Sequence, residues 1–170
     1  MNEKQLISNE ETYGPLLYGS KDVVFTHGKG AILYTSTGEE FIDFVAGHGV
    51  GNLGHAHPKV VNAVKDQIEK VSVLHSSYPN DQRGQLLKKL ADLAPKPLSN
   101  SFLSNSGTEA VEAAIKLAIV SHRSVKKPHV ISMKRGFHGR TLGSLGLTFG
   151  RPYRKAFEGA IGLDTSFASF

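Results

Sequence analysis

A short turn between an apolar run and an alanine-rich stretch has the residue types and spacing of an anion site. The turn reads Asn105-Ser106-Gly107-Thr108-Glu109-Ala110. Ser106 and Glu109 have the spacing of a capping box, which predicts that a helix begins here. Gly107 would let a bound group approach the backbone, and the first N–H groups of the helix, with the Thr108 hydroxyl, would offer donors to a phosphate. The alternative is an ordinary capped helix that binds nothing.

A second group of residues with binding chemistry follows the apolar run that ends near Met133. It reads Gly136-Phe137-His138-Gly139-Arg140-Thr141. The Phe137 ring suits stacking on a flat heteroaromatic ligand, and the Arg140 guanidinium suits a carboxylate held through two parallel hydrogen bonds. The alternative is that Phe137 belongs to the core and that Arg140 makes a surface ion pair.

The hydrophobic pattern predicts an α/β architecture that would bring these two segments to one place. Strands are expected at residues 23–25, 31–34, 40–45, near Phe102 and at 130–133, and helices at 58–71, at 80–94 and from Ser106 onward. Thr37-Gly38 would be a turn of an antiparallel meander. The later alternation of strands and helices suggests a parallel sheet, whose ligands bind beyond the carboxyl ends of the strands. Residues 1–20 are expected to be a partly ordered arm, anchored by Tyr13, Leu16, Leu17 and Tyr18.

Two histidines, His55 and His57, lie in a glycine-rich loop that ends at Pro58. Their spacing can occur in metal sites, but no further histidine or carboxylate lies at matching spacing, so no metal site is predicted. Loop packing or hydrogen bonds to backbone carbonyls are the preferred interpretation. The glycines from Gly47 to Gly54 match neither a P-loop nor a dinucleotide fingerprint.

The composition is that of a soluble globular protein, with 39% hydrophobic and 21% charged residues among 170. The net charge of +5 indicates mild attraction for small anions and gives little support to a nucleic-acid partner. The absence of cysteine excludes disulfides and thiolate metal sites. The N-terminus is too polar for a secretory signal and no apolar run approaches a membrane span, so a cytoplasmic protein is expected.

Four motifs occur in an order and at separations that are typical of one enzyme family. They are Asp43 to Gly47, Leu53 to Pro58, Asn105 to Ala110 and Phe137 to Thr141. Together, over residues 14–157, they resemble the class III (omega-amino) pyridoxal-phosphate aminotransferases. The sequence is most similar to acetylornithine aminotransferases and to lysine-pathway enzymes that act on LysW-bound aminoadipate semialdehyde. The 4-aminobutyrate and ornithine aminotransferases are the next neighbours.

The resemblance implies a fold-type I pyridoxal-phosphate-dependent transferase, with a large parallel-sheet α/β domain, a small α+β domain and a homodimeric assembly. Residues 1–60 would form an N-terminal arm and part of the small domain, and residues 61–170 the first part of the large domain. The implied reaction transfers an amino group between an ω-amino acid derivative and 2-oxoglutarate, in arginine or lysine biosynthesis.

The resemblance also implies roles for individual residues, with pyridoxal 5'-phosphate as the cofactor. Ser106, Gly107 and Thr108 would bind its phosphate, Phe137 would stack on its ring with His138 beside it, and Arg140 would hold the substrate α-carboxylate. No metal is implied.

One departure from the family is length, because its members are more than twice as long as this chain. The lysine that forms the Schiff base, and the aspartate that pairs with the pyridine nitrogen, lie in the part that has no counterpart here. No catalytic residue is therefore assigned, and the chain is interpreted as truncated and inactive alone. The alternative from a different class is a non-catalytic module that binds anionic ligands or complements a partner chain.

Overall fold

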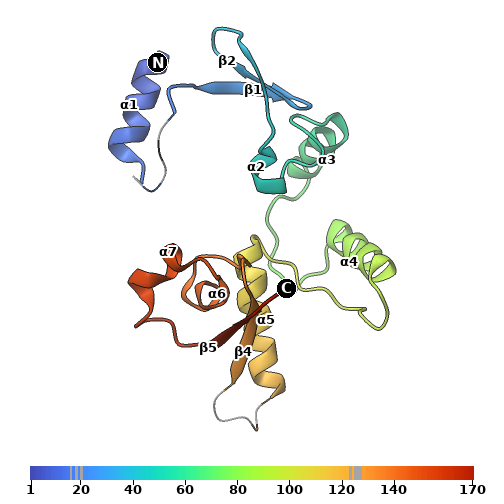
Figure 1. Ribbon diagram of the computed structural model, residues 1–170. Helices are drawn as coiled ribbons and strands as arrows, with labels where there is room; N and C mark the ends of the chain where they lie inside the picture. The colour runs from blue at the N-terminus through green and yellow to red at the C-terminus, as the bar shows by residue number, and fades with distance from the viewer. Residues whose placement is uncertain (16, 18, 20, 123, 125–127) are drawn as a thin grey trace. The chain divides into compact units, whose positions relative to one another are not determined.

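The protein folds into two compact units, as a computed structural model shows (Figure 1). The structure describes residues 1–15, 17, 19, 21–122, 124 and 128–170. Unit 1 spans Met1–Tyr78 and unit 2 spans Pro79–Phe170. The assignment of residues 1–60 and 61–170 to a small and a large domain stays a prediction. The expected anchors Leu16 and Tyr18 lie outside the described residues.

Unit 1 contains a three-stranded antiparallel sheet in the order β1-β2-β3. The strands are β1 (Phe25–Lys29), β2 (Ile32–Thr35) and β3 (Glu40–Ile42). In the central strand, Leu33 pairs with Gly28 on one side and with Phe41 on the other. Gly38 has a φ of 86° in the turn between β2 and β3, a conformation that favours glycine. The predicted meander is confirmed, although β1 begins later and β3 ends earlier than expected.

The described residues of unit 1 also form three helices: α1 (Glu3–Tyr13), α2 (Ala46–Gly49) and α3 (Pro58–Ile68). The helix predicted to begin at Pro58 is confirmed. The sequence patterns did not predict α1, which begins with a capping box formed by Asn2 and Gln5. The Gln5 N–H donates to the Asn2 side chain at 2.9 Å, and the Asn2 N–H donates to the Gln5 side chain at 3.1 Å. These bonds satisfy donors that a helix start otherwise leaves unpaired.

Unit 2 is an α/β unit built on a parallel pair of strands. Its elements are α4 (Asp81–Leu93), α5 (Gly107–Ser121), β4 (His129–Met133), α6 (Leu142–Leu147), α7 (Arg151–Arg154), η1 (Lys155–Phe157) and β5 (Asp164–Ala168). β4 and β5 are parallel, with Ile131 opposite Ser166. α6 lies between them in sequence and packs against both strands and against α5. The predicted helices at α4 and α5, the strand at β4 and the parallel pairing are confirmed.

The strand predicted near Phe102 is wrong, because residues 101–104 form no strand. An extended segment needs a partner for its backbone groups, and among the described residues none pairs with it. Phe102 is accordingly 75% exposed. The sequence patterns did not predict α6 or β5, since α6 is a short helix with two glycines and β5 depends on pairing with a strand far away in sequence.

The buried core of unit 2 lies where α5 and α6 meet. Among the described residues, the buried apolar side chains here are Ile115 of α5 and Leu145 and Leu147 of α6. Burying a leucine contributes roughly 2 kcal/mol, so these contacts hold α6 in place. Ser132 of β4 is also buried, and its hydroxyl donates to the Leu147 carbonyl at 2.7 Å. This bond attaches the C-terminal end of α6 to β4.

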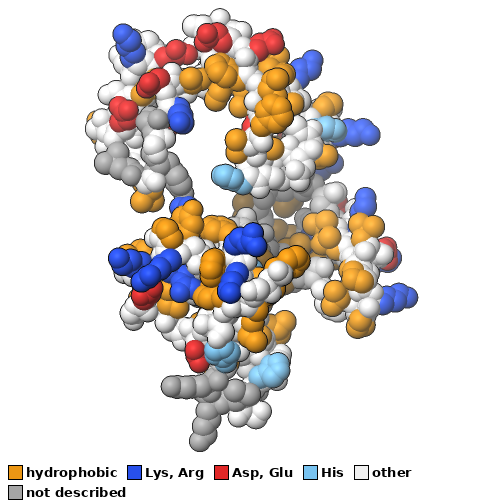
Figure 2. Space-filling model, viewed as in Figure 1, with side chains coloured by type: hydrophobic (Ala, Val, Ile, Leu, Met, Phe, Trp, Pro, Cys, Tyr) orange, Lys and Arg blue, Asp and Glu red, His pale blue; other side chains and the backbone are white. Residues whose placement is uncertain are grey.

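Hydrophobic side chains are also visible on the surface of each unit (Figure 2). Ile131 of β4 and Leu117 of α5, for example, are 68% and 69% exposed. No helix within the described residues is long and apolar enough to cross a lipid bilayer.

The cap of α4 gives a test of the local structure. The Asn80 side chain accepts from the Arg83 N–H at 3.0 Å, so Asn80→Ala is expected to destabilise the start of α4 by about 1 kcal/mol. Amide hydrogen exchange of Arg83 would accelerate. Asn62→Ala is the matched control, because Asn62 lies inside α3 and alanine is the better helix former there. Unchanged exchange at Arg83 in the Asn80 variant would contradict this assignment.

Candidate active site

The first turn of α5 has the capping box that the sequence predicts. The Glu109 N–H donates to Ser106 Oγ at 3.2 Å. In return, Glu109 Oε2 accepts from the Ser106 N–H at 3.0 Å and from the Asn105 N–H at 2.6 Å. The Glu109 carboxylate therefore binds the two backbone donors that precede the helix, and Ser106 binds the third donor of the helix.

Two backbone donors at this helix end remain available for a ligand. The N–H groups of Gly107 and Thr108 have no hydrogen-bond partner within the described residues. A Cβ added to Gly107 would meet nothing within 4 Å. Two donors at the positive end of a helix dipole, with open space next to them, suit an anion such as a phosphate.

The loop between β4 and α6 comes into direct contact with this helix end. Gly139 is buried, and a Cβ built on it would overlap the Thr108 hydroxyl oxygen and approach Ser144 Oγ to 2.6 Å. Its φ of 129° is also one that side chains other than glycine rarely adopt. The two segments singled out in the sequence therefore meet at Thr108 and Gly139.

Phe137 and Arg140 both lie against Tyr153 of α7. The rings of Phe137 and Tyr153 meet edge to face with centroids 6.0 Å apart, and Arg140 Cζ lies 5.1 Å from the centre of the Tyr153 ring. Phe137 is 59% exposed, so it is not a core residue. Sequence reasoning missed Tyr153, which lies in a four-residue helix without a recognisable motif.

His138 lies in the same loop but lines a different space. Its N–H donates to Thr148 Oγ1 at 2.9 Å. Its side chain lines an apolar hollow of about 530 Å³ between α5 and β4, together with residues that include Ile115 and Leu147. Neither Gly107 nor Phe137 lines this hollow. The role of His138 beside a cofactor ring stays a prediction.

Glu112 of α5 is a residue that the sequence patterns did not reveal. Its Oε1 accepts from the Thr141 hydroxyl and, at 2.9 Å, from the Ser144 N–H. The Thr141 hydrogen bond, followed by the backbone donors of Ser144 and Gly143, lowers the pKa of Glu112 against an opposing effect of desolvation. The carboxylate is therefore ionised at neutral pH and binds the loop through charge-assisted hydrogen bonds.

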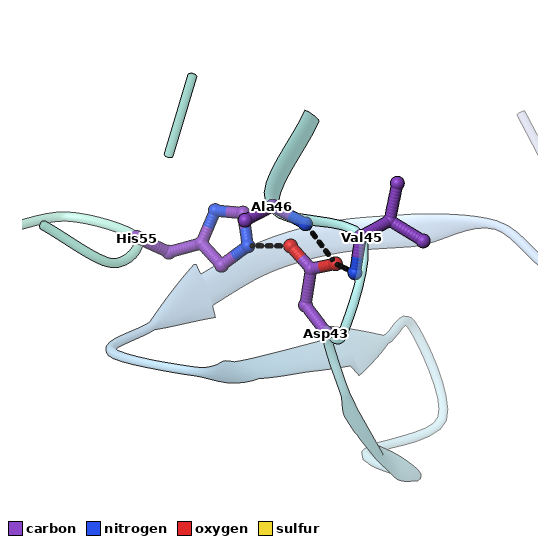
Figure 3. Close-up of polar contacts among 4 residues, drawn as sticks. All are labelled: Asp43, Val45, Ala46 and His55. Carbon is purple, nitrogen blue, oxygen red and sulfur yellow. Dashed lines mark hydrogen bonds and ion pairs between the residues drawn. The ribbon is translucent and has the colours of Figure 1, made fainter. Parts of the chain in front are cut away.

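A second ionised carboxylate, Asp43, organises the glycine-rich loop of unit 1 (Figure 3). Its Oδ1 accepts from the N–H groups of Val45 and Ala46, both at 2.9 Å, and its Oδ2 lies 2.8 Å from His55 Nε2. The Ala46 bond, then His55 and Val45, lower the pKa of Asp43. His55 also exchanges two backbone hydrogen bonds with Gly30, at 2.7 and 2.9 Å.

His55 is thus part of the loop packing, as the sequence interpretation preferred. Among the residues that the structure describes, no three histidine, aspartate or glutamate side chains gather as metal ligands would.

Comparison with known proteins gives consistent matches. The family model for class-III aminotransferases matches residues 17–167. The [LysW]-aminoadipate semialdehyde transaminase of Deinococcus radiodurans is 42% identical over 160 residues, which cover 94% of this chain and 37% of that protein. The acetylornithine aminotransferase of Methanopyrus kandleri is 40% identical over 158 residues, covering 93% of this chain and 39% of the relative. The chain thus spans less than half of the length of these relatives.

A solved structure shows the same fold. The taurine:2-oxoglutarate aminotransferase of Bifidobacterium kashiwanohense, in complex with pyridoxal phosphate and glutamate, superposes with a TM-score of 0.88 over 99% of this chain and 38% of that one. The sequence identity is 21%. The fold is therefore that of fold-type I aminotransferases, of which this chain contains a part.

The contact at Gly139 predicts a sharp sensitivity to a single methyl group. Gly139→Ala combines an unfavourable φ with overlap of the Thr108 hydroxyl, and it is expected to destabilise unit 2 by about 2 kcal/mol. Urea denaturation followed by tyrosine fluorescence measures this loss. Gly159→Ala is the control, since a Cβ at Gly159 meets nothing within 4 Å. Equal stability of the two variants would contradict the close approach.

The Asp43 contacts predict a titration at acidic pH. Because its folded pKa lies below the ordinary 3.8, the bonds to the loop are complete above 3.8 and are lost as the pH falls through the folded value. The amide proton shifts of Val45 and Ala46, followed by NMR, are expected to titrate together with a midpoint below 3.8. Asp43→Asn would abolish this titration, and a midpoint at or above 3.8 would refute the proposed contacts.

Proposed function

The chain belongs to the class-III aminotransferase family, and from that membership we propose that it forms the phosphate-binding and carboxylate-binding part of a pyridoxal-phosphate-dependent transaminase. The observation that carries the proposal is the contact between the α5 turn at Thr108 and the loop at Gly139. This contact joins two segments. One carries backbone N–H groups suited to binding an anion, and the other carries an exposed aromatic ring and a guanidinium.

The residues present fit the cofactor. The free N–H groups of Gly107 and Thr108 would hold its phosphate, with Ser106 fixing the first turn of α5 through the capping box. Phe137 is exposed and would offer a face to the pyridine ring, with His138 beside it. When bound, the cofactor supplies an electron sink that stabilises negative charge on the substrate carbon.

Arg140 would orient the substrates by binding the α-carboxylate that amino acids and oxo acids share. A guanidinium matches a carboxylate with two parallel donors, which fixes the direction of the bound molecule as well as its position. The Tyr153 ring beneath Arg140 restricts the movement of the side chain. No residue of this chain is assigned the proton transfer.

The relatives support a proposal for the substrate class. Enzymes named for acetylornithine and for LysW-bound aminoadipate semialdehyde share 40% and 42% identity with this chain. We therefore propose that the whole protein transfers an amino group between an ω-amino acid derivative and 2-oxoglutarate, in arginine or lysine biosynthesis. The whole protein is proposed to act as a homodimer.

A bulky side chain at position 107 tests the proposed phosphate site, because it would block access to the free N–H groups of Gly107 and Thr108. Gly107→Val is expected to weaken binding of both inorganic phosphate and pyridoxal phosphate about tenfold, because one blocked charge-assisted contact is worth more than 1.4 kcal/mol. Phosphorus NMR titration measures phosphate, and absorbance titration measures the cofactor.

Gly159→Ala is again the control and should bind both ligands as the unaltered chain does. Unchanged affinity of the Gly107 variant for both ligands would overturn the site, since the open space next to the helix end would then have no role.

A further inference from the structure

Glu112 links α5 to the start of α6. Its Oε1 accepts from the Thr141 hydroxyl and from the Ser144 N–H. Gly143 lies so close that an added Cβ would approach Glu112 Oε1 to 2.8 Å and overlap Oε2. Thr141 is the N-cap of α6 but makes no capping bond with its own side chain. The carboxylate of α5 therefore takes the place of the cap that α6 lacks.

The same face of α5 holds the loop at two points. Thr108 and Glu112 are four residues apart, which places them one above the other on a helix. Thr108 contacts Gly139, and Glu112 binds Thr141. Arg140 lies between these two points in sequence. The backbone on both sides of Arg140 is therefore fixed to α5, the helix whose first turn has free N–H groups suited to a phosphate.

The other end of the loop is held through α6. Thr148, at the C-terminal end of α6, is 1% exposed and accepts from the His138 N–H at 2.9 Å. Its own hydroxyl donates to the Gly139 carbonyl at 3.0 Å. Ser144 is fully buried and lies 2.8 Å from the Thr141 hydroxyl. Because Thr148 binds the backbone of His138 and Gly139, a residue that fixes the position of α6 also fixes the position of the loop.

We propose that Glu112 is a positioning residue. It sets the distance and angle between the N–H groups of α5 that would bind a phosphate and the loop that carries Phe137 and Arg140. The inference rests on the proposed function, because the distance matters only if one ligand contacts both the α5 turn and the loop. Glu112 itself does not touch the ligand. Its removal leaves the donors of α5 intact and lets the loop move relative to them.

Comparison of two ligands separates positioning from folding. Inorganic phosphate needs only the donors of α5, whereas pyridoxal phosphate needs the donors and the loop together. In the full 170-residue chain, Glu112→Ala is expected to weaken the binding of pyridoxal phosphate about tenfold, because the charge-assisted contact between Glu112 and the loop is lost. The affinity for inorganic phosphate should stay within about twofold of that of the unaltered chain. The upfield shift of the cofactor ring protons, which stacking on Phe137 would cause, should also diminish.

Two further variants keep the test independent of unfolding. Thr141→Val removes the hydroxyl donor without touching α5 and should reproduce the selective loss, whereas Thr141→Ser keeps the donor and should restore binding. Lys116→Gln is the matched control on α5, because it removes a neighbouring charge and no hydrogen bond to the loop. It should bind both ligands normally.

The outcomes distinguish the two proposals. If the unaltered chain binds neither ligand, the proposed function is overturned. If it binds both, and Glu112→Ala binds pyridoxal phosphate equally well with the same ring-proton shift, the positioning role alone is overturned. Equal loss of both ligands in that variant would also overturn it, because the effect would then lie in α5 itself.

Discussion

The close approach of the Gly139 backbone to Thr108 is the constraint on which the packing of α5 against the β4–α6 loop depends. A side chain at position 139 would separate the loop from the first turn of α5, both by overlap with the Thr108 hydroxyl and through the φ of 129°. One turn further along α5, Glu112 binds Thr141 of the same loop. The glycine at position 139 therefore permits the close approach that accompanies this second contact.

Directional bonds, more than apolar packing, fix this region. The buried apolar side chains of unit 2 within the described residues are Ile115, Leu145 and Leu147, and they hold α6 in place. The conformation of the loop that precedes α6 depends instead on buried hydroxyls such as Ser144 and Thr148, which bind backbone groups at set distances. Apolar contacts tolerate sliding, whereas a buried polar group that loses its partner costs about 1–3 kcal/mol. A loop that must present a ring and a guanidinium in one arrangement gains precision from such bonds.

The sequence predicted what is local and missed what depends on distant partners. The caps at Ser106 and Asn80 were readable because donor and acceptor lie three residues apart. The strand expected near Phe102 failed because an apolar run does not provide its own partner, and β5 was missed because its partner is β4. Glu112 was missed for the same reason, since its contacts are about thirty residues away and a glutamate on a helix is unremarkable in pattern. The motifs identified the two segments that meet at Thr108 and Gly139, but not the groups that hold them together.

A capped helix with free N–H groups is common, so the α5 turn alone would say little about function. Its meaning changes because the loop that approaches this helix end at Gly139 also carries an exposed ring and a guanidinium, both against Tyr153. Phosphate, aromatic ring and carboxylate are separate binding problems, and a ligand that carries the first two beside a substrate that carries the third needs all of them solved at fixed separations. The separations here come from α5, whose consecutive turns contact the loop through Thr108 and Glu112. In the proposed site, affinity for each group would come from individual residues, whereas selectivity for the combination would come from the helix that spaces them.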